Sequence, residues 1–276
     1  MSLRRRRILG WSVAGILIVF YTMVPVVWIL SLSFKQGDDI NNKKFFPTHW
    51  SLENYRTVFK TDLFTSALRN SLGISLIATV ISVSLATLAA YAIARLNFKG
   101  KRLVLSTALA IAIFPTIALV GPLFDMWRGL GIYDTWIGLI IPYLTFALPL
   151  SIWTMSAFFR QIPWEMEHAA QVDGATSWQA FRKVIVPLAA PGVFTTAILT
   201  FFFCWNDFLF AISLTSTDSA RTVPAALAFF QGASYFESPV PYIMAASVIV
   251  TIPVVILVLV FQRRIVAGLT SGAVKG

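Results

Sequence analysis

The sequence holds very few of the residues that usually carry chemistry. It has one cysteine, Cys204, which lies inside an apolar run, so neither a disulfide framework nor a cysteine metal site can form. Its two histidines, His49 and His168, provide no histidine cluster for a metal. It also lacks the G-x-x-x-x-G-K-[ST] run that cradles nucleotide phosphates. We therefore expect no catalytic residues, no metal and no cofactor on this chain.

Charged residues are scarce as well. They make up 12% of the 276 residues, against about 25% in soluble domains. Hydrophobic residues make up 57%, and the mean hydropathy is +0.76. The net charge of +10 could suggest a nucleic-acid partner, but no soluble domain with interleaved basic and aromatic residues is present to use it. The composition indicates an all-α integral membrane protein that binds no nucleic acid.

Six uncharged runs reach or nearly reach the ~20 residues that an apolar helix needs to cross a bilayer. The predicted spans are residues 8–34, 71–94, 103–124, 135–159, 187–213 and 241–262, and residues 263–276 form a tail. The first run is longer than the apolar region of a signal peptide, which covers about 7–15 residues, so it is predicted to stay as an anchor.

Orientation follows from the positions of Lys and Arg. One side of the six spans carries 14 of the 22 basic residues and 3 of the 12 acidic residues, whereas the other side carries 8 of each. The basic side is predicted to be cytoplasmic. It holds both termini, the 95–102 turn and the insert at residues 160–186.

The insert at 160–186 is predicted to form two short helices with an elbow. Pro163 suits the first position of a helix, and Gly174 suits its end. Thr176 and Gln179 have the spacing of a capping box, which would begin a second helix that ends near Pro187. One face of the first helix carries residues three or four apart, namely Met166, Ala169, Ala170 and Asp173.

Two spans contain residues that a substrate pathway would use. Phe114 and Pro115 lie in the middle of the third span, where a proline tends to kink a helix. Trp205, Asn206 and Asp207 lie in the fifth span, and an acid within a span is usually functional or paired. Asp207 would lie about 30 Å from Pro187, near the outer boundary. Packing of kinked helices and snorkelling of the acid are open alternatives.

The run HAAQVDG followed by FRKVIVP resembles the EAA loop of permease subunits of bacterial ATP-binding-cassette importers. His168 stands where that family has glutamate, and Glu167 precedes it. The runs LGIYDTW, LTFALPLSIW and QRRIVAGLTSGAVKG extend the resemblance to residues 20–276 and to carbohydrate importers of the maltose and trehalose type.

This resemblance implies that the chain is one permease of a heterodimer in a bacterial inner membrane. A homodimeric ATPase would bind ATP and Mg, and an extracytoplasmic sugar-binding protein would deliver the substrate. The residues implied to contact the ATPase are Met166, Glu167, His168, Ala169, Ala170, Asp173, Gly174, Ala175, Pro187, Lys275 and Gly276. An outer loop implied to contact the binding protein holds Gln231, Gly232, Tyr235 and Phe236.

Two other classes of function remain as alternatives. A secondary transporter or channel would use ionisable groups inside its spans, and only Asp207 qualifies. That class also leaves the insert at 160–186 without a role. An intramembrane enzyme would need paired acids, a histidine motif or a serine nucleophile with a base within the spans, and the spans contain none of these.

Overall fold

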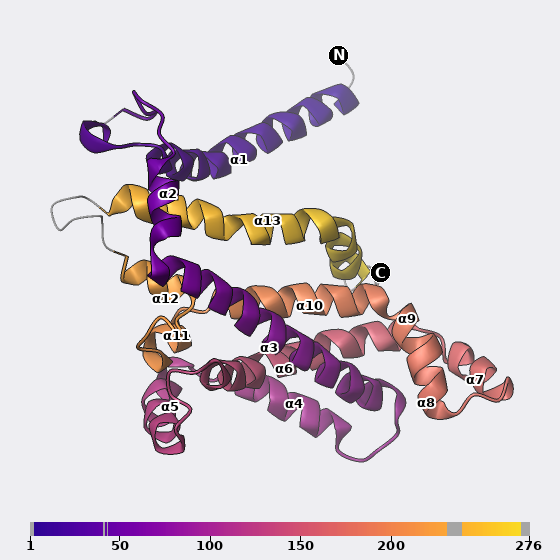
Figure 1. Cartoon of the computed structure of the whole chain (residues 1–276). Helices are drawn as coiled ribbons and strands as arrows, with labels where there is room; N and C mark the ends of the chain where they lie inside the picture. The colour runs from indigo at the N-terminus through magenta and orange to yellow at the C-terminus, as the bar shows by residue number, and fades with distance from the viewer. Residues whose placement is uncertain (1–2, 41, 43, 231–238, 272–276) are drawn as a thin grey trace. The chain divides into compact units, whose positions relative to one another are not determined.

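A computed structural model describes residues 3–40, 42, 44–230 and 239–271. Every regular element of these residues is a helix, which confirms the predicted all-α fold (Figure 1). Contacts divide the chain into two compact units. The first consists of Met1–Thr65 and Leu227–Pro253, and the second of Ser66–Ala226 and Val254–Gly276.

The first unit contains the N-terminal helix α1 (Leu3–Ser33), the short α2 (Glu53–Lys60) and the first part of α13 (Val240–Ser271). A buried lysine, Lys35, holds the loop that follows α1. Its ammonium group donates to the carbonyl of Lys44 at 2.6 Å and lies 5.5 Å from the ring centroid of Trp28. Asn54 of α2 donates to the carbonyls of Ser33 and Lys35, both at 2.8 Å, so the loop is fixed to α2.

The second unit is a bundle of apolar helices of different lengths. Its main helices are α3 (Asp62–Arg95), α4 (Lys101–Ala112), α5 (Ile117–Leu130), α6 (Trp136–Gln161), α10 (Ala190–Trp205) and α11 (Leu209–Leu214). Side chains of α3, α6 and α11, among them Ile74, Leu139 and Phe210, form one buried core. Small residues let α3 and α6 approach closely, since a Cβ atom on Gly73 would lie 2.3 Å from the indole of Trp136.

Among the described residues, four helices are long and apolar enough to cross a membrane, and the number rises to six if two bent pairs are each one span. The predicted third span is bent by 90° between α4 and α5, in the region that contains Phe114 and Pro115. Pro115 explains the break, because proline lacks a backbone N–H and disfavours helix in the preceding residue. The second bent pair consists of Ser177–Leu188 and Ala190–Trp205, at 72°, so this bend lies where the insert meets the start of the predicted fifth span.

The ends of two helices differ from the ends of the uncharged runs. Helix α3 begins at Asp62, whereas the uncharged run begins at residue 71. Helix α13 continues to Ser271, although the apolar run ends at residue 262. Charged residues limit the apolar part of a helix but do not end it, and α3 accommodates Asp62 in its first turn, where negative charge suits the helix dipole.

Candidate functional site

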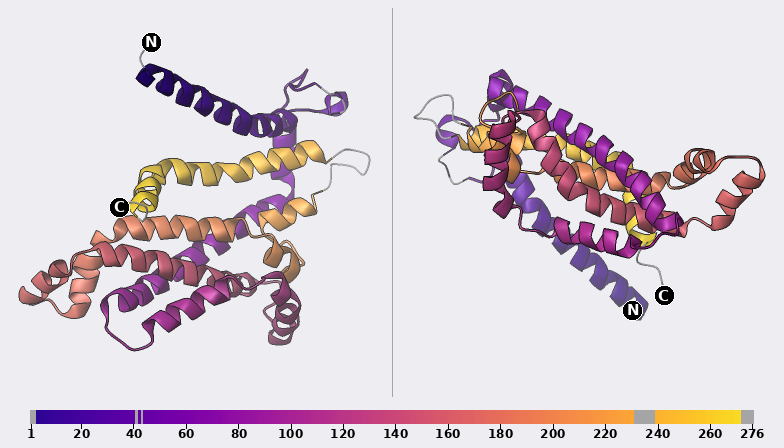
Figure 2. Two further views of the ribbon diagram at one scale, coloured as in Figure 1. Left: turned by 180° about the vertical axis from the view of Figure 1, so that it is seen from behind. Right: turned by 90° about the horizontal axis from the view of Figure 1, so that it is seen from below.

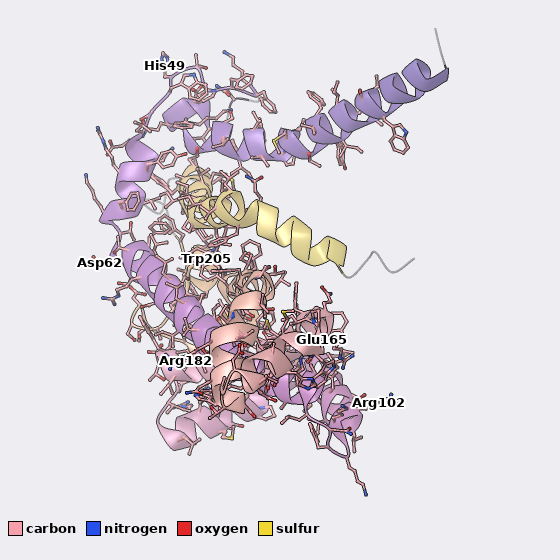
Figure 3. All side chains as sticks on the ribbon, turned by 90° about the vertical axis from the view of Figure 1, so that its right-hand side faces the viewer. His49, Asp62, Arg102, Glu165, Arg182 and Trp205 are labelled. Carbon is pink, nitrogen blue, oxygen red and sulfur yellow. The ribbon has the colours of Figure 1, made fainter. Side chains whose placement is uncertain are left out.

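The insert folds as a helical hairpin at one end of the second unit. We call residues 164–188 the hairpin: it contains α7 (Trp164–Val172), α8 (Ser177–Ala180), a π-helical turn (Phe181–Ile185) and α9 (Val186–Leu188). Figure 2 shows from two sides that α7 and α8 extend beyond the ends of α6 and α10. Figure 3 looks onto this end and labels Glu165 on α7, Arg182 in the π-helical turn and Arg102 at the start of α4.

The elbow of the hairpin has the predicted geometry. Gly174 has a φ of +88°, in the left-handed region that glycine adopts readily, and the N–H of Ala175 donates to the carbonyl of Ala170 at 2.9 Å. The capping box is complete: Thr176 accepts from the N–H of Gln179 at 3.2 Å, and the Gln179 side chain accepts from the N–H of Thr176 at 2.8 Å. Local residue chemistry therefore fixes the angle between α7 and α8.

The second helix ends near Pro187, as predicted: the helical run that begins at Ser177 stops at Leu188. The N–H of Val186 donates to the carbonyl of Phe181 in a π-type bond, and Pro187 then lies in the first turn of α9, where it needs no N–H donor. The chain breaks at Ala189, between α9 and α10. The break is thus placed after the proline, at the point where the hairpin joins α10.

A buried polar cluster fixes the start of the hairpin to the end of α3. Arg95 donates to the carbonyl of Ile162 at 2.6 Å, and its guanidinium lies 4.5 Å from the ring centroid of Trp164. Its Nε atom lies 3.9 Å from Oε2 of Glu167, whose other oxygen accepts a hydrogen bond from the Tyr91 hydroxyl. Sequence reasoning did not place Arg95 or Tyr91 at this site, because the cluster joins residues far apart in the chain.

The residues predicted to contact an ATPase do not share one environment. Met166, His168, Ala169, Asp173, Gly174 and Pro187 are exposed, and Ala170 and Ala175 are half-buried. Glu167 is only 5% exposed because it faces α3. Two large apolar side chains near the elbow, Val172 at 87% and Trp178 at 59% exposure, were not predicted as site residues. Apolar residues within an otherwise polar insert were the signal that could have identified them.

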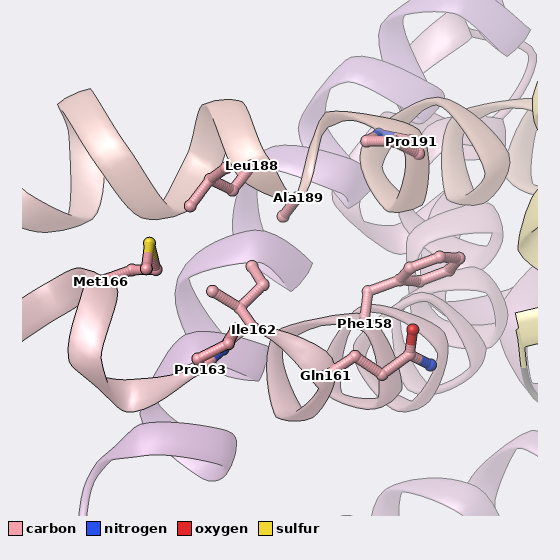
Figure 4. Close-up of a pocket in the computed structure, with 8 residues that line it drawn as sticks. All are labelled: Phe158, Gln161, Ile162, Pro163, Met166, Leu188, Ala189 and Pro191. Carbon is pink, nitrogen blue, oxygen red and sulfur yellow. The ribbon is translucent and has the colours of Figure 1, made fainter. Parts of the chain in front are cut away.

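An apolar groove with a volume of 390 Å³ lies where the hairpin meets the bundle (Figure 4). Both connections of the hairpin to the bundle line it: Ile162 and Pro163 at the start of α7, and Leu188 and Ala189 at the break before α10. Met166 of α7 also lines the groove. The groove therefore borders the hairpin on the side where it joins α6 and α10.

The residues predicted for a substrate pathway lie beside two interruptions of the bundle, one between α4 and α5 and one between α10 and α11. Phe114 is half exposed, in the break between α4 and α5. Trp205 is buried and stacks on Phe201, whereas Asn206 is exposed in the break between α10 and α11. Asp207 accepts hydrogen bonds from the Tyr143 hydroxyl at 2.9 Å and from the N–H of Ala211 at 3.0 Å. Asp207 therefore caps α11 and ties it to α6.

Two groups of predicted contact residues remain, those for the binding protein and those of the C-terminal tail. Gln231, Gly232, Tyr235 and Phe236 lie outside the described residues. The same holds for Lys275 and Gly276.

Comparison with known proteins connects this geometry to transport. A family model described as "Binding-protein-dependent transport system inner membrane component" matches residues 82–271, which include the whole hairpin. The chain is 58% identical to the trehalose transport system permease protein SugB of Mycobacterium tuberculosis, over 98% of this chain and 99% of that protein. It is 40% identical to the trehalose/maltose transport system permease protein MalG of Thermococcus litoralis, over 96% of this chain and 95% of that protein.

A solved structure has the same fold. It is the crystal structure of a bacterial ABC transporter involved in the import of the acidic polysaccharide alginate, which superposes with a TM-score of 0.80 at 24% identity. The match covers 95% of this chain and 98% of that chain.

Proposed function

We propose that this chain forms half of the translocation pathway of an ATP-driven carbohydrate importer. The basis is that the chain belongs to the family of binding-protein-dependent transport system inner membrane components. The chain is a membrane permease and not itself an enzyme. As its substrate we propose a disaccharide of the trehalose type, from its similarity to the two permeases of trehalose and trehalose/maltose systems. ATP and Mg would bind to a partner ATPase.

The observation that carries this proposal is the hairpin. Its elbow is held by Gly174 and a complete capping box, and its start is anchored to α3 through Arg95. Two non-helical connections, Ile162–Pro163 and Ala189, join it to the bundle. Its exposed residues Met166, Ala169 and Asp173, together with Val172 and Trp178, form a surface of mixed polarity. Such a surface suits a protein partner that pushes on the hairpin and switches the bundle by rigid-body movement.

The proposed partners are a sister permease, a homodimeric ATPase and an outer sugar-binding protein. The hairpin and both termini would face the cytoplasm, as the distribution of Lys and Arg predicts. Lys275 and Gly276 would contact the ATPase, and the loop with Gln231, Gly232, Tyr235 and Phe236 would contact the binding protein. A solved relative of the fold is described in complex with a periplasmic protein that carries an alginate pentasaccharide, which supports a partner of that kind.

The substrate pathway is proposed to pass the break between α4 and α5 and the break between α10 and α11. Phe114 and Pro115 are at one break, and Asn206 exposes a polar side chain at the other. Trp205 and Asp207 would keep Asn206 in place, since the first is buried and the second caps α11.

Purification of the membrane complex tests the function directly. We expect an ATPase, a second permease and this chain to co-purify, and we expect ATP hydrolysis to rise when trehalose-loaded binding protein is added. Uptake of sugar by this chain alone in vesicles without ATP would contradict the proposal.

A further inference from the structure

We propose that Arg95 and Glu167 form a joint that carries movement of α7 to α3, an inference that rests on the proposed function. By joint we mean these two residues with their contacts to Tyr91, Ile162 and Trp164. Both are positioning residues: they act through the helices they connect and need not touch sugar or ATP.

The joint connects the start of the hairpin to the C-terminal end of α3 through several contacts. Arg95 contacts the backbone of Ile162, the ring of Trp164 and the carboxylate of Glu167. Tyr91, one helical turn earlier on α3, donates to the same carboxylate. A displacement of α7 must therefore either shift the end of α3 or break contacts on both sides of Glu167.

Burial decides between these two outcomes. The side chains of Arg95 and Glu167 are 2% and 7% exposed, so neither charge can be transferred to water while the fold persists. Separation of a buried pair leaves uncompensated charge, which is strongly unfavourable. The pair is thus expected to stay together, and α3 is expected to follow α7.

The pair also has room to shorten. Among the described residues, Arg95 Nε and Glu167 Oε2 have no hydrogen-bond partner, and these are the two atoms that face each other at 3.9 Å. A small shift of α7 towards α3 would bring them to the 2.7–2.9 Å of a charge-assisted hydrogen bond.

Helix α3 is suited to pass the movement on. It is unbroken from Asp62 to Arg95, whereas both bent pairs in the bundle are interrupted. Near its other end, Asn70 donates to the carbonyl of Asp218 at 2.9 Å, and Ser71 accepts from the N–H of Val223 at 2.8 Å. Movement that enters at Arg95 can therefore reach the segment that precedes α12 (Val223–Ala228) without crossing a break.

The test uses the assembled transporter in proteoliposomes and measures sugar molecules imported per ATP hydrolysed. Glu167→Gln removes the charge but keeps an oxygen that can accept from Tyr91, and Arg95→Lys keeps the charge but loses the planar contact with Trp164. For each variant we expect this ratio to fall about 5-fold or more, the size of a lost coupling between sites. The double variant should lose no more than the worse single variant, because the two residues act as one unit.

Glu165→Gln is the matched control. Glu165 lies on the same helix and is exposed, so the same chemical change there should leave the ratio as in the wild-type complex. A second measurement reports movement: spin labels on Leu96 and Gln171 should keep one separation in the nucleotide-free and vanadate-trapped wild-type complex. In Glu167→Gln the separation should change on trapping.

A wild-type ratio in both joint variants would overturn the inference. The inference would also be overturned if ATP hydrolysis, sugar uptake and the amount of bound ATPase all fell together while the ratio of sugar imported to ATP hydrolysed stayed unchanged. In that case Arg95 and Glu167 would only stabilise the fold. Failure of the proposed function is recognised separately: the wild-type complex itself would import sugar without ATP, and the inference would fail with it.

Discussion

The Tyr143 hydroxyl donates a hydrogen bond of 2.9 Å to the carboxylate of Asp207, the one acidic residue in the predicted fifth span. The same carboxylate accepts from the N–H of Ala211 at 3.0 Å. Asp207 therefore joins the first turn of α11 to α6, next to the break that exposes Asn206.

Asp207→Asn should lower sugar uptake at limiting substrate. The amide is neutral, and a hydrogen bond to a neutral acceptor contributes about 1 kcal/mol less than one to a carboxylate, so the contacts with Tyr143 and Ala211 weaken and Asn206 is held less firmly. The measurement is the initial rate of uptake well below saturation. Tyr143→Phe removes the other half of the contact and should shift uptake in the same direction. Unchanged uptake in Asp207→Asn would remove Asp207 from the proposed pathway.

Gly174→Val should weaken the contact with the ATPase. A Cβ at Gly174 meets no atom within 4 Å, so the cost is conformational: a φ of +88° costs about 1–2 kcal/mol for an ordinary L-residue and more for a β-branched one. The readouts are the amount of ATPase that co-purifies and its stimulation by loaded binding protein. Gly129→Val is the control, because Gly129 is equally free of neighbours but has no positive φ. Equal effects at both positions would show that the contact with the ATPase does not depend on the positive φ of Gly174.

Asn70→Ala should destabilise the second unit. The Asn70 side chain is fully buried, donates to the carbonyls of Asp218 and Arg221, and accepts from the Trp136 indole at 3.1 Å. Removing these partners leaves buried polar groups unsatisfied, at a cost of about 1–3 kcal/mol. The measurement is the Tm of the purified protein, which should be lower in Asn70→Ala than in the wild type. The exposed Asn97 offers the control Asn97→Ala, and equal Tm values for the two variants would contradict the assigned role of Asn70.

Truncation after Leu269 should reduce ATP hydrolysis stimulated by loaded binding protein by about 5-fold, a typical coupling between sites. The reason is the proposed contact of Lys275 and Gly276 with the ATPase, and the ATPase should still co-purify through the hairpin. Lys275→Arg keeps the charge and serves as the control. Full stimulation in the truncated protein would exclude the tail from coupling.

The sequence predicted those parts of the site whose causes are local. Gly174, Thr176 and Gln179 act within one or two turns of the chain, so their spacing was enough to predict the elbow and the capping box. The anchor of the hairpin could not be predicted in this way. Arg95 and Glu167 are brought together by the packing of α3 against the hairpin, whereas the family resemblance implied that Glu167 contacts the ATPase.

The same distinction holds for the spans. Uncharged runs located the apolar helices, because the bilayer requires about 20 such residues whatever the packing. The breaks were harder to place. Pro115 marked one break and Pro187 marked the region of another, but a π-helical turn accommodated Pro187, so the chain broke two residues later, at Ala189. Helix α3 also extended to Asp62, since charge ends an apolar run without ending a helix.

Crosslinking from the hairpin tests the central claim most directly. Cys204 is buried, so a cysteine introduced at Ala169 or Asp173 would be the accessible thiol of this chain. In membranes that contain the whole transporter, we predict that a short thiol-reactive crosslinker joins either position to the ATPase, and that a cysteine at Asn97, outside the hairpin, gives far less product. If neither hairpin position ever reaches a nucleotide-hydrolysing protein while the complex imports sugar, the account of the hairpin as the coupling element is wrong.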